Sequence, residues 1–306
     1  MAAGGLGEAR SIDLDGRVNY VGPTGDGPDM VLVHGLGGSL DNWVAVAPQL
    51  ARDYRVTALD LRGFGRTPLE DSGSTLVHDN RILLDRFLDE VVGGSAILVG
   101  NSMGGMISIL EAATEPDKVA ALVLVDPVLP YPKGQEADQA VAGAFGVYLM
   151  DNAEEIVQGF LEQTGPEQSV LMTLQLCSVD MNRIPKEAVE GLIALAHERA
   201  DMKWPARAQI EAARSLMELS GNEDEYLESV RKVTAPTLLL HGEKDRLIPL
   251  AAAEAVAKVR PDWTFEVFED IGHVPQLEAP DRFVETVTGW LSRMDIGSPS
   301  LASPTI

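Results

Sequence analysis

The sequence predicts an α/β fold in which a mostly parallel β-sheet is flanked by helices and interrupted by a helical insertion. Two observations lead to this prediction. Short runs rich in Val, Ile and Leu alternate along the chain with segments of helical periodicity, as expected when parallel strands are joined by helices. Residues 131–232 break this alternation and contain no convincing strand. We therefore expect one α/β core that carries a separate helical unit.

Several predicted strands are apolar at every position, which is typical of strands covered on both faces. The chain should begin with a hairpin, in which residues 17–21 pair with residues 11–13 across Asp15 and Gly16. The remaining strands are predicted at residues 30–34, 55–59, 96–99, 120–125, 237–241 and 264–268.

Helices are predicted between these strands, where apolar residues recur at helical spacing. They are expected at residues 41–50, 77–91, 103–113, 250–259 and 280–291. The last of them begins with Pro280 and Asp281, and the first turn of a helix tolerates a missing N–H and favours a negative charge.

The insertion is rich in Ala, Glu, Leu, Met and Gln, and about a hundred residues are too many for a simple loop in a compact domain. We predict an α/β core of residues 11–130 and 233–293, with residues 131–232 forming a helical cap or lid. Its methionines and aromatic residues should make the covered pocket apolar. Residues 1–10 and 294–306 are expected to be flexible termini.

Composition limits the partners of the protein. The chain has 47 acidic and 24 basic residues and a formal net charge of −23, so binding to nucleic acid is not expected. No apolar run is long enough to span a bilayer, and we expect no stable membrane insertion. The single cysteine, Cys177, excludes an intrachain disulfide framework. The N-terminal residues do not resemble a signal peptide, so a cytoplasmic location is expected.

The strongest chemical signal follows the strand predicted at residues 96–99. Gly100, Ser102 and Gly104 form a G-x-S-x-G pattern between this strand and a helix-forming stretch. Such a strand–turn–helix elbow holds a nucleophilic serine at the apex of a strained turn, where only glycine fits two residues away on either side. The turn also places Ser102 at a helix N-terminus, which favours a developing negative charge. Ser102 is therefore the predicted nucleophile.

A serine nucleophile needs a base, and the base needs an acid that orients it. His273 lies in a loop between the last predicted strand and the last helix, from which it can reach back to the elbow. Asp245 follows the preceding strand and is the predicted acid. Asp126, directly after the strand at residues 120–125, is the alternative acid. Two backbone N–H groups, those of Met103 and of Leu36 in a Gly-rich turn, are the predicted oxyanion hole.

Residues 34–38, 60–65, 100–105, 242–245 and 272–276 together resemble the α/β-hydrolase superfamily. The resemblance implies a sheet of eight strands, mostly parallel, with a helical lid over the active site. The elbow also looks like that of the meta-cleavage carbon–carbon hydrolases, although Val274 stands where those enzymes usually have Trp. The overall pattern is more similar to capped carboxylesterases, lipases and lactonases.

The expected function is hydrolysis of a carboxylic ester or lactone of a hydrophobic small molecule through an acyl-enzyme on Ser102. Alternatives are carbon–carbon hydrolysis, perhydrolysis or a lyase reaction with the same triad, and a ligand receptor on this fold. No cofactor is expected. No set of His, Asp and Glu has metal-ligand spacing, so no metal site is predicted.

Overall fold

The computed structural model describes residues 7–294 and residue 296, and it contains an eight-stranded sheet. Strands β1 and β2 form the predicted hairpin, β2 runs antiparallel to β4, and every other neighbouring pair is parallel. The prediction of a mostly parallel sheet flanked by helices is confirmed. In spatial order, the strands are β1 (Ala9–Asp13), β2 (Arg17–Thr24), β4 (Arg55–Leu59), β3 (Asp29–Val33), β5 (Ala96–Asn101), β6 (Val119–Val125), β7 (Thr237–Gly242) and β8 (Thr264–Phe268).

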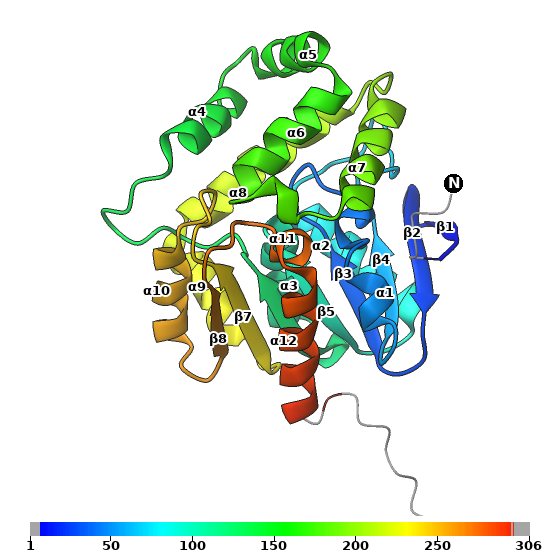
Figure 1. Ribbon diagram of the computed structural model, residues 1–306, viewed down its shortest axis with the longest axis vertical. Coiled ribbons are helices and arrows are strands. Elements are labelled where there is room, and N and C mark those ends of the chain that lie inside the picture. The colour runs from blue at the N-terminus through cyan, green and yellow to red at the C-terminus, as the bar shows by residue number, and fades with distance from the viewer. Residues whose placement is uncertain (1–6, 295, 297–306) are drawn as a thin grey trace, which may run out of the picture.

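Helices cover both faces of the sheet because alternate residues of each strand point to opposite sides. In β3, Val31 and Val33 belong to one buried cluster, whereas Met30 and Leu32 belong to the other. One cluster is closed by α2 (Val77–Phe87), α3 (Met103–Thr114), α9 (Glu223–Lys232) and α10 (Leu250–Val259). The other is closed by α1 (Ala47–Leu50) and α12 (Pro280–Arg293); Figure 1 shows α12 in front of the sheet.

Two predicted helices differ from the observed ones. The helix expected at residues 41–50 is divided into η1 (Leu40–Trp43) and α1. Pro48 explains the break, since its ring would clash with the carbonyl four residues earlier in a continuous helix. The helix expected at residues 77–91 is α2 followed by a π-helical turn, η2 (Leu88–Val92), which ends at Gly93 with a positive φ of 77°. A 3-10 turn, η3 (Pro116–Lys118), follows α3.

The insertion between β6 and β7 is helical, as predicted (Figure 1). Its last helix, however, belongs to the core layer. Tyr226 and Val230 of α9 are buried against the helices beside the sheet, and the Tyr226 hydroxyl donates to the Val128 carbonyl at 2.9 Å. Within the range predicted as the cap, α9 therefore packs on the core. The helices before it are α4 (Gln139–Tyr148), α5 (Ala153–Thr164), α6 (Pro166–Cys177), η4 (Met181–Arg183), α7 (Lys186–Arg199) and α8 (Pro205–Gly221).

The ends of the core also differ from the prediction. Of the N-terminal residues expected to be flexible, Ala9 and Arg10 pair with β2 as part of β1. Of the C-terminal residues expected to be flexible, Met294 and Ile296 donate backbone hydrogen bonds to α12. The rest of both predicted termini, residues 1–6, 295 and 297–306, lies outside the described residues. None of the helices described has the length and apolar character needed to cross a membrane.

Candidate active site

Ser102 lies at the apex of the turn between β5 and α3. Its φ of 55° and ψ of −117° are unusual for a residue with a side chain and indicate backbone strain. A Cβ on Gly104 would lie 2.2 Å from the Val33 carbonyl oxygen, and a Cβ on Gly100 would lie 2.5 Å from the Gly104 oxygen. Only glycine fits at these two positions, as the G-x-S-x-G pattern predicts.

Asp245 and His273 form a direct pair. Asp245 follows β7, and His273 lies between β8 and α11 (Pro275–Glu278). The Nδ1 of His273 is 2.7 Å from the Oδ2 of Asp245. The other carboxylate oxygen of Asp245 accepts the N–H groups of Leu247 at 2.7 Å and Ile248 at 3.1 Å. Burial opposes ionisation of Asp245, but its interactions with His273 outweigh burial and hold the pKa of the carboxyl below its usual value. Asp245 is therefore an anion that orients the imidazole.

Asn101, the last residue of β5, links the Ser102 turn to the loop that carries His273. The Asn101 amide donates to the carbonyls of Val125, at 3.0 Å, and His273, at 3.2 Å. Among the described residues, no hydrogen bond joins the Ser102 hydroxyl to the imidazole. Catalytic hydrogen bonds often form only when substrate is bound, so this arrangement is compatible with a serine–histidine pair.

The two N–H groups predicted for the oxyanion hole are available. Neither Leu36 nor Met103 donates its N–H to a protein acceptor within the part of the chain that the structure describes. The turn that carries Leu36 comes close to Ser102 at Gly35, since a Cβ on Gly35 would lie only 2.9 Å from the Ser102 Cβ. The turn that carries Leu36 therefore lies against the predicted nucleophile.

His34 fixes this turn. Its Nδ1–H donates to the Gly35 carbonyl at 2.7 Å, and its Nε2 accepts the Leu61 N–H at 3.0 Å. Burial lowers the pKa of His34 to about 4, although the bond to Gly35 opposes this shift. The imidazole is therefore neutral at physiological pH, which it must be for Nε2 to accept a hydrogen bond.

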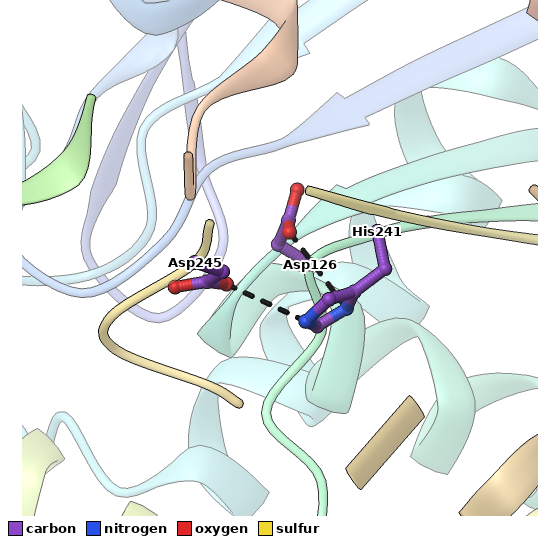
Figure 2. A group of neighbouring side chains, drawn as sticks. All are labelled: Asp126, His241 and Asp245. Atoms are coloured by element: carbon purple, nitrogen blue, oxygen red, sulfur yellow. Dashed lines mark ion pairs between the residues drawn. The ribbon is translucent and has the colours of Figure 1, made fainter. Parts of the chain in front are cut away.

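Asp126, the alternative acid, occupies a different position. It directly follows β6 and has a positive φ of 44°, and its Oδ1 accepts the Gly242 N–H at 2.8 Å. Figure 2 shows Asp126 and Asp245 both facing the His241 ring, at 3.7 Å from its Nδ1 and Nε2 respectively. His273 bonds to Asp245 and not to Asp126. Of the two candidate acids, the structure brings only Asp245 to His273.

The group of Asp126, His241 and Asp245 was not predicted as a cluster, and its ligand atoms lie within 4.8 Å of one another. Burial, followed by the charge of Asp245, raises the pKa of Asp126, and burial lowers the pKa of His241. Both shifts favour the neutral forms of the two side chains. His241 donates from Nε2 to the Ile248 carbonyl at 2.9 Å. Within this cluster, the side-chain atoms without a hydrogen-bond partner are Asp126 Oδ2 and His241 Nδ1. Two free atoms are fewer than a protein zinc site requires, and we assign the cluster a hydrogen-bonding role.

A buried carboxylate that the sequence did not indicate supports the His273 loop. Glu278 is 2% exposed. Its Oε2 accepts the Gly272 N–H at 2.8 Å, and its Oε1 accepts the N–H groups of Val179 and Asp180, each at 2.9 Å. The Cys177 carbonyl in turn accepts the His273 N–H at 2.7 Å. Because these partners are 98 and 99 residues away in sequence from Glu278, no local pattern could have revealed this link between the insertion and His273.

Curated proteins from several organisms align with most of this chain. A pimeloyl-[acyl-carrier protein] methyl ester esterase from Aromatoleum aromaticum is 30% identical over 83% of the chain and 94% of its own length. A 2-hydroxy-6-oxo-6-(2'-aminophenyl)hexa-2,4-dienoic acid hydrolase from Metapseudomonas resinovorans is 27% identical over 88% of the chain and 86% of its own length. The dihydrolipoyllysine-residue acetyltransferase component of the acetoin cleaving system from Cupriavidus necator is 29% identical over 89% of the chain, which spans 66% of that protein.

Solved structures share the fold. A thermophilic esterase from Thermogutta terrifontis superimposes with a TM-score of 0.71 and 23% identity, over 95% of this chain and all of that one (100%). The family model of the alpha/beta hydrolase fold matches residues 28–280, which include the elbow, Asp245 and His273. The chain therefore belongs to the α/β-hydrolase fold family, and its enzyme class is that of the hydrolases.

Proposed function

We propose that the protein is a serine hydrolase that cleaves a carboxylic ester or lactone of a hydrophobic small molecule, with Ser102, His273 and Asp245 as its triad. The observation that carries the proposal is the strained Ser102 turn, whose preceding residue, Asn101, bonds to the backbone of His273, which in turn lies 2.7 Å from Asp245. No cofactor is required by this chemistry.

In the proposed mechanism, the Ser102 hydroxyl attacks the ester carbonyl while His273 Nε2 takes its proton. Asp245 stabilises the imidazolium that forms. The N–H groups of Leu36 and Met103 donate to the oxyanion of the tetrahedral intermediate. The imidazolium then protonates the departing alkoxide, and a water molecule activated by His273 hydrolyses the acyl-enzyme.

An apolar substrate is supported by the composition of α4. Residues 139–150 include no charged side chain, and Phe145 and Tyr148 pack edge to face with ring centroids 5.6 Å apart. The net charge of −23 disfavours an anionic substrate. We also propose that α4–α8 act as the cap of the site, because the Cys177 carbonyl of α6 holds the His273 backbone. A cytoplasmic location stays a prediction from the sequence.

Replacement of the nucleophile tests the proposal. Ser102→Ala should reduce hydrolysis of p-nitrophenyl esters to background, since the attacking oxygen is removed. A fluorophosphonate probe should label the wild type and not the variant. The unfolding midpoint should not fall, because the change removes one small hydroxyl from a turn that is held by its glycines. Ester turnover that survives in Ser102→Ala would refute the assignment.

Carbon–carbon hydrolysis is the second candidate, and the hexadienoic acid hydrolase from M. resinovorans favours it. The same triad would then act on a vinylogous diketone. A panel containing p-nitrophenyl esters and a ring-fission diketone separates the two functions. A kcat/KM at least tenfold higher for the diketone would replace the ester proposal with this one.

A further inference from the structure

Two polar side chains of the insertion lie beside the turn that carries Leu36. Gln209 belongs to α8, and its Oε1 lies 3.0 Å from the point that a Cβ on Gly37 would occupy. Tyr148 is the last residue of α4, and its hydroxyl accepts a hydrogen bond from Gln209 Nε2 at 3.2 Å. The two residues thus form a polar pair across the two helices.

The opposite end of the same turn contacts the predicted nucleophile. A Cβ on Gly35 would lie 2.9 Å from the Ser102 Cβ. Gly35 and Gly37 are two residues apart, so their Cα atoms are separated by at most about 7.6 Å. The turn at residues 35–37 therefore lies between the predicted nucleophile and the Gln209–Tyr148 pair.

The pair is held in place from both helices. On α8, Ala208 and Ala212 are fully buried in the core, which fixes the helix that carries Gln209. Arg214, also on α8, donates to the carbonyls of Tyr148 at 2.6 Å and Met150 at 2.9 Å, and it thereby ties down the C-terminal end of α4. The polar groups are preorganised and do not depend on a mobile loop.

The hydrogen-bonding capacity of the pair is only partly used. Among the described residues, Gln209 Oε1 accepts no hydrogen bond and the Tyr148 hydroxyl donates none. Burial raises the pKa of the Tyr148 phenol, so the hydroxyl keeps its proton and remains a donor. Both side chains are half-buried, so a substrate that covers them has to replace any hydrogen bonds that they make to water.

We propose that Tyr148 determines specificity by donating its hydroxyl proton to an oxygen atom of the substrate close to the scissile ester group, and that Gln209 positions this hydroxyl through the hydrogen bond from its Nε2. This inference rests on the proposed function and deepens it. The substrate class is a small ester whose otherwise apolar chain carries a hydrogen-bond-accepting oxygen, such as an ether, keto or hydroxyl oxygen, on the acyl or the alcohol side.

Two pairs of esters, each differing by one methylene replaced by an ether oxygen, test the proposal. The acyl-side pair is p-nitrophenyl pentanoate and p-nitrophenyl 3-methoxypropanoate; the alcohol-side pair is butyl pentanoate and 2-methoxyethyl pentanoate. For at least one pair, the ratio of kcat/KM for the oxygen ester to that for the methylene ester should fall about three- to tenfold in Gln209→Leu and in Tyr148→Phe. Because the two esters of a pair share the scissile group and the chain length, the ratio cancels effects of a substitution that are common to both.

Further variants separate recognition from structural damage. Gln158→Leu is the matched control, because it removes an exposed glutamine amide that bonds to Glu162 on α5 and should leave both ratios unchanged. The double variant Gln209→Leu/Tyr148→Phe should lose no more than the larger single change, since the two residues act as a pair. If wild type cleaves the esters but neither ratio changes in Gln209→Leu or Tyr148→Phe, this inference is wrong and the proposed function stands. If wild type cleaves no ester, the proposed function itself fails.

Discussion

At the scale of single residues, two buried aspartates near neighbouring strand ends have pKa values shifted in opposite directions. Burial opposes ionisation of Asp245, but His273, His241 and the Ile248 N–H together hold its pKa below the usual value, whereas burial and then the Asp245 charge raise the pKa of Asp126. The Oδ1 of Asp126 accepts the N–H of Gly242, the last residue of β7 before the Asp245 loop. Their contributions to turnover should therefore differ.

Asparagine substitutions distinguish the two residues. Asp245→Asn should lower kcat about 10³- to 10⁴-fold, because a neutral amide no longer stabilises the imidazolium. Asp126→Asn should retain kcat within about tenfold, because the amide oxygen can still accept the Gly242 N–H. Steady-state kinetics with one p-nitrophenyl ester measures both. The reverse ranking of the two variants would make Asp126 the acid.

His34 predicts a specific loss of stability in acid. Its pKa falls from 6.5 to about 4 on folding, so below pH 6.5 the unfolded chain binds a proton that the folded chain does not. The free energy of unfolding should decrease as the pH falls from 6.5 to 4, by at most about 1.4 kcal/mol per pH unit from this group. His34→Asn should lose less stability between pH 7 and pH 5 than wild type does, measured by urea unfolding. His78→Gln, at an exposed position, is the control and should follow wild type. If His34→Asn and wild type lose equal stability, His34 does not titrate as predicted.

At the scale of secondary-structure elements, the strands and core helices follow from local patterns, but the connections between distant elements do not. Periodicity predicts α10 at its observed bounds, and the G-x-S-x-G pattern predicts the turn between β5 and α3. Helical periodicity does not show the break that Pro48 imposes within residues 41–50. The packing of α9 on the core does not follow from its sequence, which resembles that of the other helices in the insertion.

Glu278 shows how one short helix depends on contacts that are remote in sequence. Glu278→Gln replaces one of the two accepting carboxylate oxygens with an amide NH2 group, which is a donor and would face a backbone N–H donor. We expect kcat to fall about tenfold or more through displacement of His273, KM to change little, and the unfolding midpoint to fall by several degrees. Glu285→Gln, at an exposed site on α12, is the control. If Glu278→Gln is destabilised but keeps wild-type kcat, Glu278 has only a structural role.

At the scale of the whole molecule, an ion-pair network joins the insertion to the core. Arg66, from the loop after β4, contacts Asp41 at 3.0 Å and Glu198 of α7 at 2.8 Å. Glu198 is half-exposed, so its pair contributes little by itself. The Asp41 side chain is 8% exposed, and removal of Arg66 would leave this carboxylate buried without its cation.

Hydrogen exchange tests this connection. Arg66→Ala should accelerate amide exchange in α7 while the central strands remain protected, and it should lower the free energy of unfolding by roughly 1 kcal/mol or more. The control is Lys186→Ala, which removes a solvent-exposed ion pair with Glu190 on the same helix. Unchanged exchange in α7 of Arg66→Ala would show that apolar packing alone holds the insertion.

The sequence by itself determined the α/β class, the position of the insertion and the candidate residues Ser102, Asp245 and His273. These features depend on local patterns: continuous apolar strands, a turn that requires glycines around the serine, and polar residues in the loops that follow strands. Only the tertiary structure decided that His273 bonds to Asp245 and not to Asp126, that Glu278 and Cys177 hold the His273 loop, and that Gln209 and Tyr148 meet beside Gly37. Such contacts join residues far apart in the chain, and their existence depends on how the elements pack, which no local pattern of residues specifies.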